Sequence, residues 1–223
     1  MSKPFLARGS RIERCGNCLL AKSVCICSYK LSYQAKAGFY LLMHHNEAFK
    51  PTNTGRLIED CISGTKRFEW SRTEPSEALL MALSDPAIDP YIVFPEADDY
   101  RERMVDYTLK PGKQPVFIIL DGTWRQARRM FRHSRYLDTL PVIQPRITAT
   151  SQYKLRKAAV PGQLCTVEVA AEMLKLVNDQ VGSEILANYF SIFNEHYKSS
   201  RMDRPVVTDS EAKQWIRAYQ QLC

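Results

Sequence analysis

The 223-residue chain has no apolar run that approaches the roughly 20 residues needed to cross a membrane. Its first residues, Met1 to Arg8, lack the apolar core of a secretory signal peptide. It also contains no internal repeat, no low-complexity tract and no Gly-x-Gly-x-x-Gly pattern. We therefore expect a cytoplasmic globular protein without a membrane partner. The sequence leaves the oligomeric state open, with a monomer as the working expectation.

The cysteines do not have the distribution of a disulfide framework. They number seven, and four of them crowd into residues 15–27. Four thiolates can close the tetrahedral shell of a structural zinc ion. Two disulfides or four free thiols are the alternatives, and a reducing compartment favours zinc over both. The predicted zinc ligands are Cys15, Cys18, Cys25 and Cys27.

Acidic residues are scarce in one segment of the chain. Residues 121–160 hold nine Lys or Arg and only two Asp or Glu, so this segment accounts for the whole net charge of +7. Basic charge gathered in one segment indicates a polyanionic partner. A solvated helix face is the plainer interpretation, but such faces usually mix the two signs of charge.

The segment begins with a change of pattern around Asp121. Residues 116–120 are all apolar and rich in β-branched side chains, which predicts a strand buried on both faces of a parallel sheet. Gly122 permits a tight turn, and Thr123 is a candidate helix N-cap. From Trp124 the period becomes helical, with arginines recurring at spacings of three and four residues on one face: Arg125, Arg128, Arg129 and Arg132. A carboxylate at the end of a buried strand, beside this basic helix, indicates a binding site more than a simple turn residue.

The remaining segments alternate between strand and helix patterns. We expect strands at 38–43, 67–70, 91–94 and 140–145, and helices near 52–61, 76–83, 166–177, 183–197 and 209–221, with a further helix within 98–114. Thr166 is the expected N-cap of its helix. Aromatic residues of the last two helices (Tyr189, Phe190, Phe193 and Trp215) are expected in the core. This order predicts an α/β fold with a largely parallel sheet.

The stretch Asp121-Gly122-Thr123-Trp124 resembles the Asp-x-Thr-Trp signature of the DTW-domain family. Further segments are similar to that family, namely the cysteine quartet, His44, Glu47, Thr52–Gly55, Phe94, Pro95, Ser151, Tyr153, Leu155, Arg156, Thr166 and Glu168. Two positions depart from the family pattern, because His45 stands where Pro is expected and Cys165 where Ser is expected.

Members of this family are tRNA-uridine aminocarboxypropyltransferases, distantly related to the knotted SPOUT class of RNA methyltransferases. The resemblance implies a SPOUT-like knotted sheet flanked by helices, with S-adenosylmethionine (SAM) as co-substrate and tRNA as partner. It implies transfer of the 3-amino-3-carboxypropyl group to N3 of a uridine, expected at variable-loop position 47, giving acp3U and methylthioadenosine. The expected parts are a zinc-binding lobe (1–34), the SPOUT-like DTW domain (35–182) and C-terminal helices packed on it (183–223).

The resemblance and the strand-end positions together suggest residue roles. Asp121 is the expected general base. SAM is expected to contact Phe94, Pro95, Leu120, Gly122, Thr123, Trp124, Gln144, Tyr153 and Leu155. RNA is expected to contact His44, Thr52, Asn53, Thr54, Arg56, Arg125, Arg128, Arg129, Lys154, Arg156 and Lys157. Trp124 is left between two interpretations, a wall for adenine and a core anchor of its helix.

Two other functions stay open at this point. One is a SAM-dependent SPOUT methyltransferase, which would share the fold and co-substrate but transfer a different carbon. The other is a zinc-containing RNA-binding protein without catalytic activity. The mass added to tRNA separates the first from an aminocarboxypropyltransferase, and a SAM-binding measurement separates the second.

Overall fold

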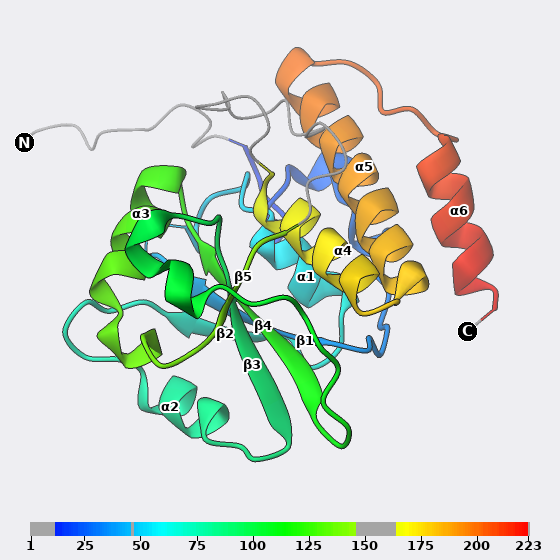
Figure 1. The fold of residues 1–223 in the computed structure, drawn as a ribbon. Coiled ribbons are helices and arrows are strands. Elements are labelled where there is room, and N and C mark those ends of the chain that lie inside the picture. The colour runs from blue at the N-terminus through cyan, green and yellow to red at the C-terminus, as the bar shows by residue number, and fades with distance from the viewer. Residues whose placement is uncertain (1–11, 46, 146–163, 223) are drawn as a thin grey trace, which may run out of the picture.

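A computed structural model describes residues 12–45, 47–145 and 164–222 of the protein. One five-stranded sheet forms the centre of the molecule (Figure 1), and its strand order is β2-β1-β4-β3-β5. Every pair of neighbouring strands is parallel. The strands are β1 (Gly38–Met43), β2 (Lys66–Glu69), β3 (Ile88–Val93), β4 (Gln114–Asp121) and β5 (Val142–Ile143). The predicted α/β fold with a parallel sheet is confirmed.

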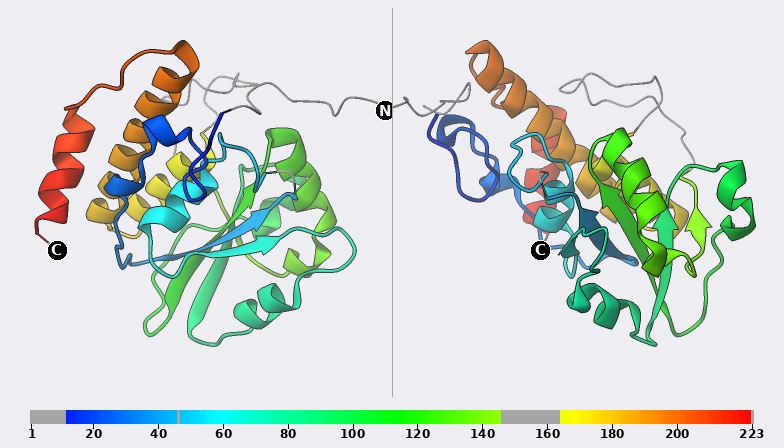
Figure 2. Two further views of the ribbon diagram at one scale, coloured as in Figure 1. Left: turned by 180° about the vertical axis from the view of Figure 1, so that it is seen from behind. Right: turned by 90° about the vertical axis from the view of Figure 1, so that its left-hand side faces the viewer.

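Helices cover both faces of the sheet, as the views in Figures 1 and 2 show. On one face lie α1 (Gly55–Cys61), α4 (Thr166–Leu176) and α5 (Gln180–Met202), and on the other lie α2 (Glu77–Leu83) and α3 (Trp124–His133). Successive side chains of a strand point to opposite faces. In β4, Phe117 and Ile119 join the first core while Ile118 and Leu120 join the second. The predicted burial of this strand on both faces is therefore confirmed.

The expected helix within 98–114 is present only as a short 3₁₀-helix and not as an α-helix. The structure has only a 3₁₀-helix at Asp98–Arg103, which is kinked at Tyr100 and contains no buried residue. Most helical stability in proteins comes from packing an apolar face against the core. This segment has no buried apolar face, so nothing stabilises a longer helix here.

The expected cap of α4 is also wrong, because Cys165 and not Thr166 is the N-cap residue. The Glu168 carboxylate accepts a hydrogen bond of 2.8 Å from the Cys165 amide, which closes the first turn. Thr166 is thereby the first residue inside the helix. Its hydroxyl is free for the contact with Asp121 described below.

The N-terminal cysteine segment packs directly on the main domain. It contains two short 3₁₀-helices, Lys22–Val24 and Cys27–Tyr29. Leu20 and Ile26 belong to the same buried cluster as the inner face of α5. The expected core aromatics Tyr189, Phe190 and Phe193 are buried there, and Trp215 packs against the cluster.

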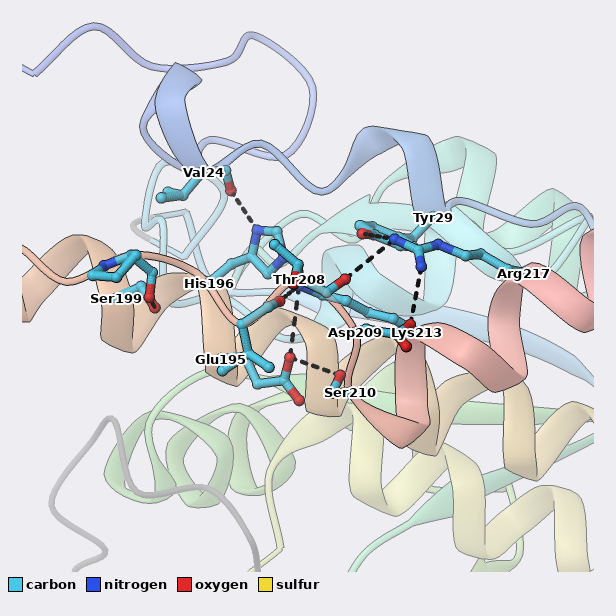
Figure 3. Close-up of polar contacts among 12 residues, drawn as sticks. Val24, Tyr29, Glu195, His196, Ser199, Thr208, Asp209, Ser210, Lys213 and Arg217 are labelled. Atoms are coloured by element: carbon cyan, nitrogen blue, oxygen red, sulfur yellow. Dashed lines mark hydrogen bonds and ion pairs between the residues drawn. The ribbon is translucent and has the colours of Figure 1, made fainter.

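Helix α6 (Glu211–Gln220) joins the C-terminal segment to the cysteine segment (Figure 3). Two cations of α6 lie over the Tyr29 ring, with Lys213 Nζ at 5.6 Å and the Arg217 guanidinium carbon at 5.8 Å from its centroid. On α5, His196 Nδ1 donates a hydrogen bond of 3.1 Å to the Val24 carbonyl. Among the described residues, no helix is long and apolar enough to cross a membrane.

Candidate functional site

Asp121 is the last residue of β4 and lies opposite Met43, the last residue of β1, in the register of these two neighbouring strands. Only 2% of its surface is exposed. The Asp121 carbonyl accepts a hydrogen bond of 3.0 Å from the amide of His44, the first residue of the loop after β1. The carboxylate thus lies at the edge of the sheet where open α/β folds bind ligands.

Two side chains from distant segments donate hydrogen bonds to the Asp121 carboxylate. Asn53 Nδ2 lies 2.7 Å from Oδ2, and Thr166 Oγ1 lies 2.7 Å from Oδ1. Asn53 also accepts a hydrogen bond of 3.0 Å from the Arg56 amide, which fixes its side chain at the start of α1. The carboxylate therefore joins the residue just before the N-cap of α1 and the first residue of α4 to the end of β4.

Gly55 allows this close arrangement. A Cβ atom at this position would lie 3.1 Å from Asp121 Cγ and 3.3 Å from Asn53 Oδ1, and closer still to Asp121 Oδ2. Carbon atoms in van der Waals contact keep about 3.5–4.0 Å apart. Only a residue without a side chain fits against the carboxylate.

The start of α3 is fixed by a capping box. Thr123 Oγ1 accepts a hydrogen bond of 3.3 Å from the Gln126 amide, and Gln126 Oε1 accepts one of 2.7 Å from the Thr123 amide. The expected N-cap is confirmed. The same glutamine places Nε2 3.3 Å from His44 Nδ1, so α3 is tied to the loop after β1.

His44, expected from the sequence to contact RNA, is buried in the loop after β1 beside Asp121. Its ring stacks on Trp70 with centroids 5.8 Å apart and lies 4.4 Å from the His45 ring. Burial, and then the neighbouring His45, lower the pKa of His44, which favours the neutral imidazole. Trp70 was expected only as a strand residue. Its indole donates a hydrogen bond of 2.9 Å to Ser134 Oγ, so a sequence-distant aromatic holds the histidine in place.

The loop after β1 is held by buried polar groups. Glu47 is completely buried and pairs with Lys50. Arg56 is expected to contact RNA, but in this structure its guanidinium donates to the Ala48 carbonyl at 2.8 Å and to the Cys18 carbonyl at 3.4 Å. These bonds link α1 to the loop and to the cysteine segment.

The arginine stripe of α3 (Arg125, Arg128, Arg129 and Arg132) is exposed. Together with His133 its side chains line a pocket of about 310 Å³. Within the described part of the chain, none of the four arginines forms an ion pair with a carboxylate. A group of unpaired guanidinium groups suits the binding of phosphate or another anion.

The residues expected near SAM follow three adjacent strands, β3, β4 and β5. Phe94 comes directly after β3 and is buried, and its ring stacks on Phe131 of α3 with centroids 4.4 Å apart. Trp124 lies 6.4 Å from Phe94 and is half-buried, so it borders both the core and the site. Gln144 follows β5 and accepts a hydrogen bond of 3.2 Å from the Glu96 amide. Residues 153–157, also expected at the site, lie outside the described residues, as does Ser151.

The four clustered cysteines come together in space. Their sulfur atoms all lie within 4.8 Å of one another, with 3.6 Å between Cys15 and Cys27 and 3.8 Å between Cys18 and Cys25. Sulfurs about 2.3 Å from a tetrahedral zinc ion would lie about 3.8 Å apart, so this set fits the ion. Backbone N–H groups of Cys18 and Asn17 lower the pKa of Cys15 to about 6, whereas burial raises the pKa of Cys18 and of Cys27, so in the absence of an ion the thiolate resides on Cys15. A bound metal would stabilise the thiolate form of the other three.

Comparison with known proteins agrees with the motifs. The model of the DTW domain matches residues 12–198. The tRNA-uridine aminocarboxypropyltransferase 2 of Mus musculus is 26% identical over 173 residues, which cover 75% of this chain and 57% of that protein. The protein of the same name from Drosophila melanogaster is 24% identical over 181 residues, covering 77% and 69%. The chain thus spans only a little over half the length of the mouse relative, and no solved structure matches it significantly. Because the domain model covers most of its length, the chain belongs to the DTW-domain family.

Proposed function

We propose that the protein transfers the 3-amino-3-carboxypropyl group of SAM to N3 of a tRNA uridine, giving acp3U and methylthioadenosine. The observation that carries this proposal is the DTW match over residues 12–198, together with relatives named as tRNA-uridine aminocarboxypropyltransferases. The position of the Asp-x-Thr-Trp stretch supports it, because this stretch lies at the carboxyl end of β4. A uridine of the variable loop is the proposed acceptor.

We assign Asp121 the role of general base. The N3–H proton of uridine passes to the carboxylate, and N3 forms a bond to the γ-carbon of SAM. The bond between that carbon and sulfur breaks with its electron pair on sulfur, so the positive sulfonium leaves as neutral methylthioadenosine. Hydrogen bonds from Asn53 and Thr166 would hold the carboxylate in one orientation for this step. A positioning role is the competing assignment, because both carboxylate oxygens already accept hydrogen bonds.

The proposed SAM site lies in the loops after β3, β4 and β5. These strands are neighbours in the sheet, so Phe94 and Gln144, which follow β3 and β5, and Leu120, near the end of β4, lie at adjacent strand ends. Phe94 and Trp124 together offer apolar ring surface there. Pro95, Gly122 and Thr123 complete the described part of the proposed site. We further propose the SPOUT-like knotted chain path for this fold.

tRNA is the proposed partner, and the arginine stripe would hold its phosphates. Phosphate contacts position a nucleic acid without reading its sequence. The exposed guanidinium groups of α3, which have no carboxylate partner among the described residues, fit that role, and Arg128 and Arg129 lie in the middle of the stripe.

We propose that Cys15, Cys18, Cys25 and Cys27 hold a structural zinc ion. Four protein thiolates leave no open position, so the ion would stabilise the fold without taking part in the reaction. Thiolates kept for a metal fit a reducing compartment, which supports a cytoplasmic location.

Mass spectrometry of tRNA nucleosides tests the proposed activity. Unmodified tRNA is incubated with the full-length protein and SAM, then digested and analysed. We expect a uridine that has gained an aminocarboxypropyl group, with methylthioadenosine as co-product. A uridine that has gained a methyl group would identify a methyltransferase instead. Unchanged nucleosides with several tRNA species would contradict the proposed transfer.

A further inference from the structure

Phe49 is a large apolar side chain that the fold leaves in solvent. It lies in the loop between β1 and α1, and 82% of its surface is exposed. Single exposed apolar residues are common on protein surfaces and need no explanation by themselves. Phe49, however, lies in a loop that is attached to the proposed reaction centre, and this position does need an explanation.

The two ends of this loop are attached to Asp121. The His44 amide donates to the Asp121 carbonyl, and the Asn53 side chain donates to the Asp121 carboxylate. Phe49 is four residues from Asn53, and four extended residues span at most about 14 Å. The Cα atom of Phe49 therefore lies only a few stacked-nucleotide steps, of about 3.4 Å each, from that of Asn53, whose side chain contacts Asp121.

The backbone on either side of Phe49 is fixed. The Arg56 guanidinium donates to the Ala48 carbonyl at 2.8 Å, and the Lys50 amide donates to the Glu47 carbonyl at 3.1 Å. The buried Glu47 carboxylate also pairs with Lys50. A ring carried by such a backbone loses little further freedom when a ligand stacks on it, which favours binding.

The loop also adjoins the arginine stripe. Gln126 Nε2 of α3 lies 3.3 Å from His44 Nδ1. Burial lowers the pKa of His44 most, and the positive charge of Arg129 on α3 lowers it further, which shows that Arg129 lies near this loop. In Figures 1 and 2, α3 and this loop both lie at the carboxyl end of the sheet. Proteins that bind single-stranded nucleic acid combine a basic groove with aromatic rings on which bases stack. RNA-binding proteins likewise stack unpaired bases on aromatic side chains.

We propose that Phe49 is a stacking platform for an unpaired base of the RNA, within a few nucleotides of the one that enters the Asp121 site. This inference rests on the proposed function. It makes Phe49 a positioning residue, because the ring would hold a neighbouring base while the reacting uridine lies at the carboxylate.

Three variants of the full-length protein test the inference. Phe49→Ala removes the ring, and Phe49→Trp keeps an aromatic surface. Leu109→Ala is the matched control, because Leu109 is also a large apolar residue, 66% exposed, and lies in the segment that leads into the opposite, amino-terminal end of β4. Binding of fluorescently labelled, unmodified tRNA is measured by anisotropy at several salt concentrations, and acp3U formation is measured in parallel.

We expect Phe49→Ala to weaken tRNA binding about 10-fold, within the range that base–aromatic stacking supplies. The slope of log K against log salt should stay the same, since a ring releases no counterions. Phe49→Trp should bind within about twofold of the natural protein, which is the rescue that stacking predicts, and Leu109→Ala should bind like the natural protein.

The outcomes separate this inference from the proposed function. If the natural protein forms acp3U and Phe49→Ala binds tRNA and turns over normally, the stacking role is refuted and the reaction stands. If the natural protein binds tRNA without forming acp3U and Phe49→Ala still binds about 10-fold more weakly, the reaction is refuted and the stacking role stands. Equal losses in Phe49→Ala and Leu109→Ala, or a loss that Phe49→Trp does not restore, would also refute stacking.

Discussion

Gly55→Ala tests whether the Asp121 carboxylate is as tightly enclosed as the structure indicates. The added methyl group would lie 3.1 Å from Asp121 Cγ, so the carboxylate must move away by about 0.4 Å or more to reach normal contact. The oxygen nearest to the methyl group is the one that accepts the Asn53 hydrogen bond. The substitution therefore disturbs a buried, charged hydrogen bond in addition to crowding the site.

The expected loss of stability is the balance of three terms. A hydrogen bond to a charged group contributes about 1.5–3 kcal/mol, and overpacking a buried site costs about 1–3 kcal/mol. Alanine favours a helix over glycine by up to about 1 kcal/mol, which offsets part of this. We expect a net loss of about 2–4 kcal/mol in the free energy of unfolding, and a melting temperature lower by roughly 5–15 °C for a chain of this size.

Urea unfolding of the natural and variant proteins measures this loss. Gly16→Ala is the matched control, since a Cβ atom there meets no heavy atom within 4 Å, and it should change stability by less than about 0.5 kcal/mol. In an Asp121→Ala background the methyl group has room, so Gly55→Ala should then cost little. An equal loss in both backgrounds, or a Gly55→Ala protein as stable as the natural one, would refute the proposed enclosure.

Three further predictions follow from the site. Purified protein should contain one zinc per chain by elemental analysis, and Cys18→Ser should lower stability because metal affinity contributes folding free energy; protein without stoichiometric zinc would refute this. Arg128→Ala combined with Arg129→Ala should make the slope of log K for tRNA against log salt shallower by about 2, or about 1 for each lost phosphate contact. An unchanged slope in the folded variant would mean that this face is only solvated. Asp121→Asn should lower the single-turnover rate by about 10²–10⁴ with little change in SAM affinity by calorimetry. A near-normal rate would move the base elsewhere, with Glu47 the next residue to test, and a joint loss of rate and SAM binding would mean a positioning role.

The pattern of single segments was sufficient to predict most of the helices and strands. The apolar run before Asp121 predicted β4, and the helical period after Thr123 predicted α3 with its arginines on one face. The four cysteines were predicted to meet because they lie within thirteen residues of one another. Strands, helices and a local cysteine cluster depend mainly on residues close together in the sequence, so the periodicity and spacing of those residues are enough to predict them.

The tertiary structure alone decided which distant side chains surround Asp121. Asn53 and Thr166 are 68 and 45 residues away from it, and they meet it because parallel strands bring the starts of α1 and α4 to one edge of the sheet. The Thr166 hydroxyl donates its hydrogen bond to Asp121 and not to the backbone of its own helix. The N-cap of α4 is therefore Cys165, whereas the sequence predicts Thr166 as the N-cap. Trp70 behind His44 likewise has no local signal. Contacts of this kind depend on how the chain returns to the sheet, and no short window of sequence records that path.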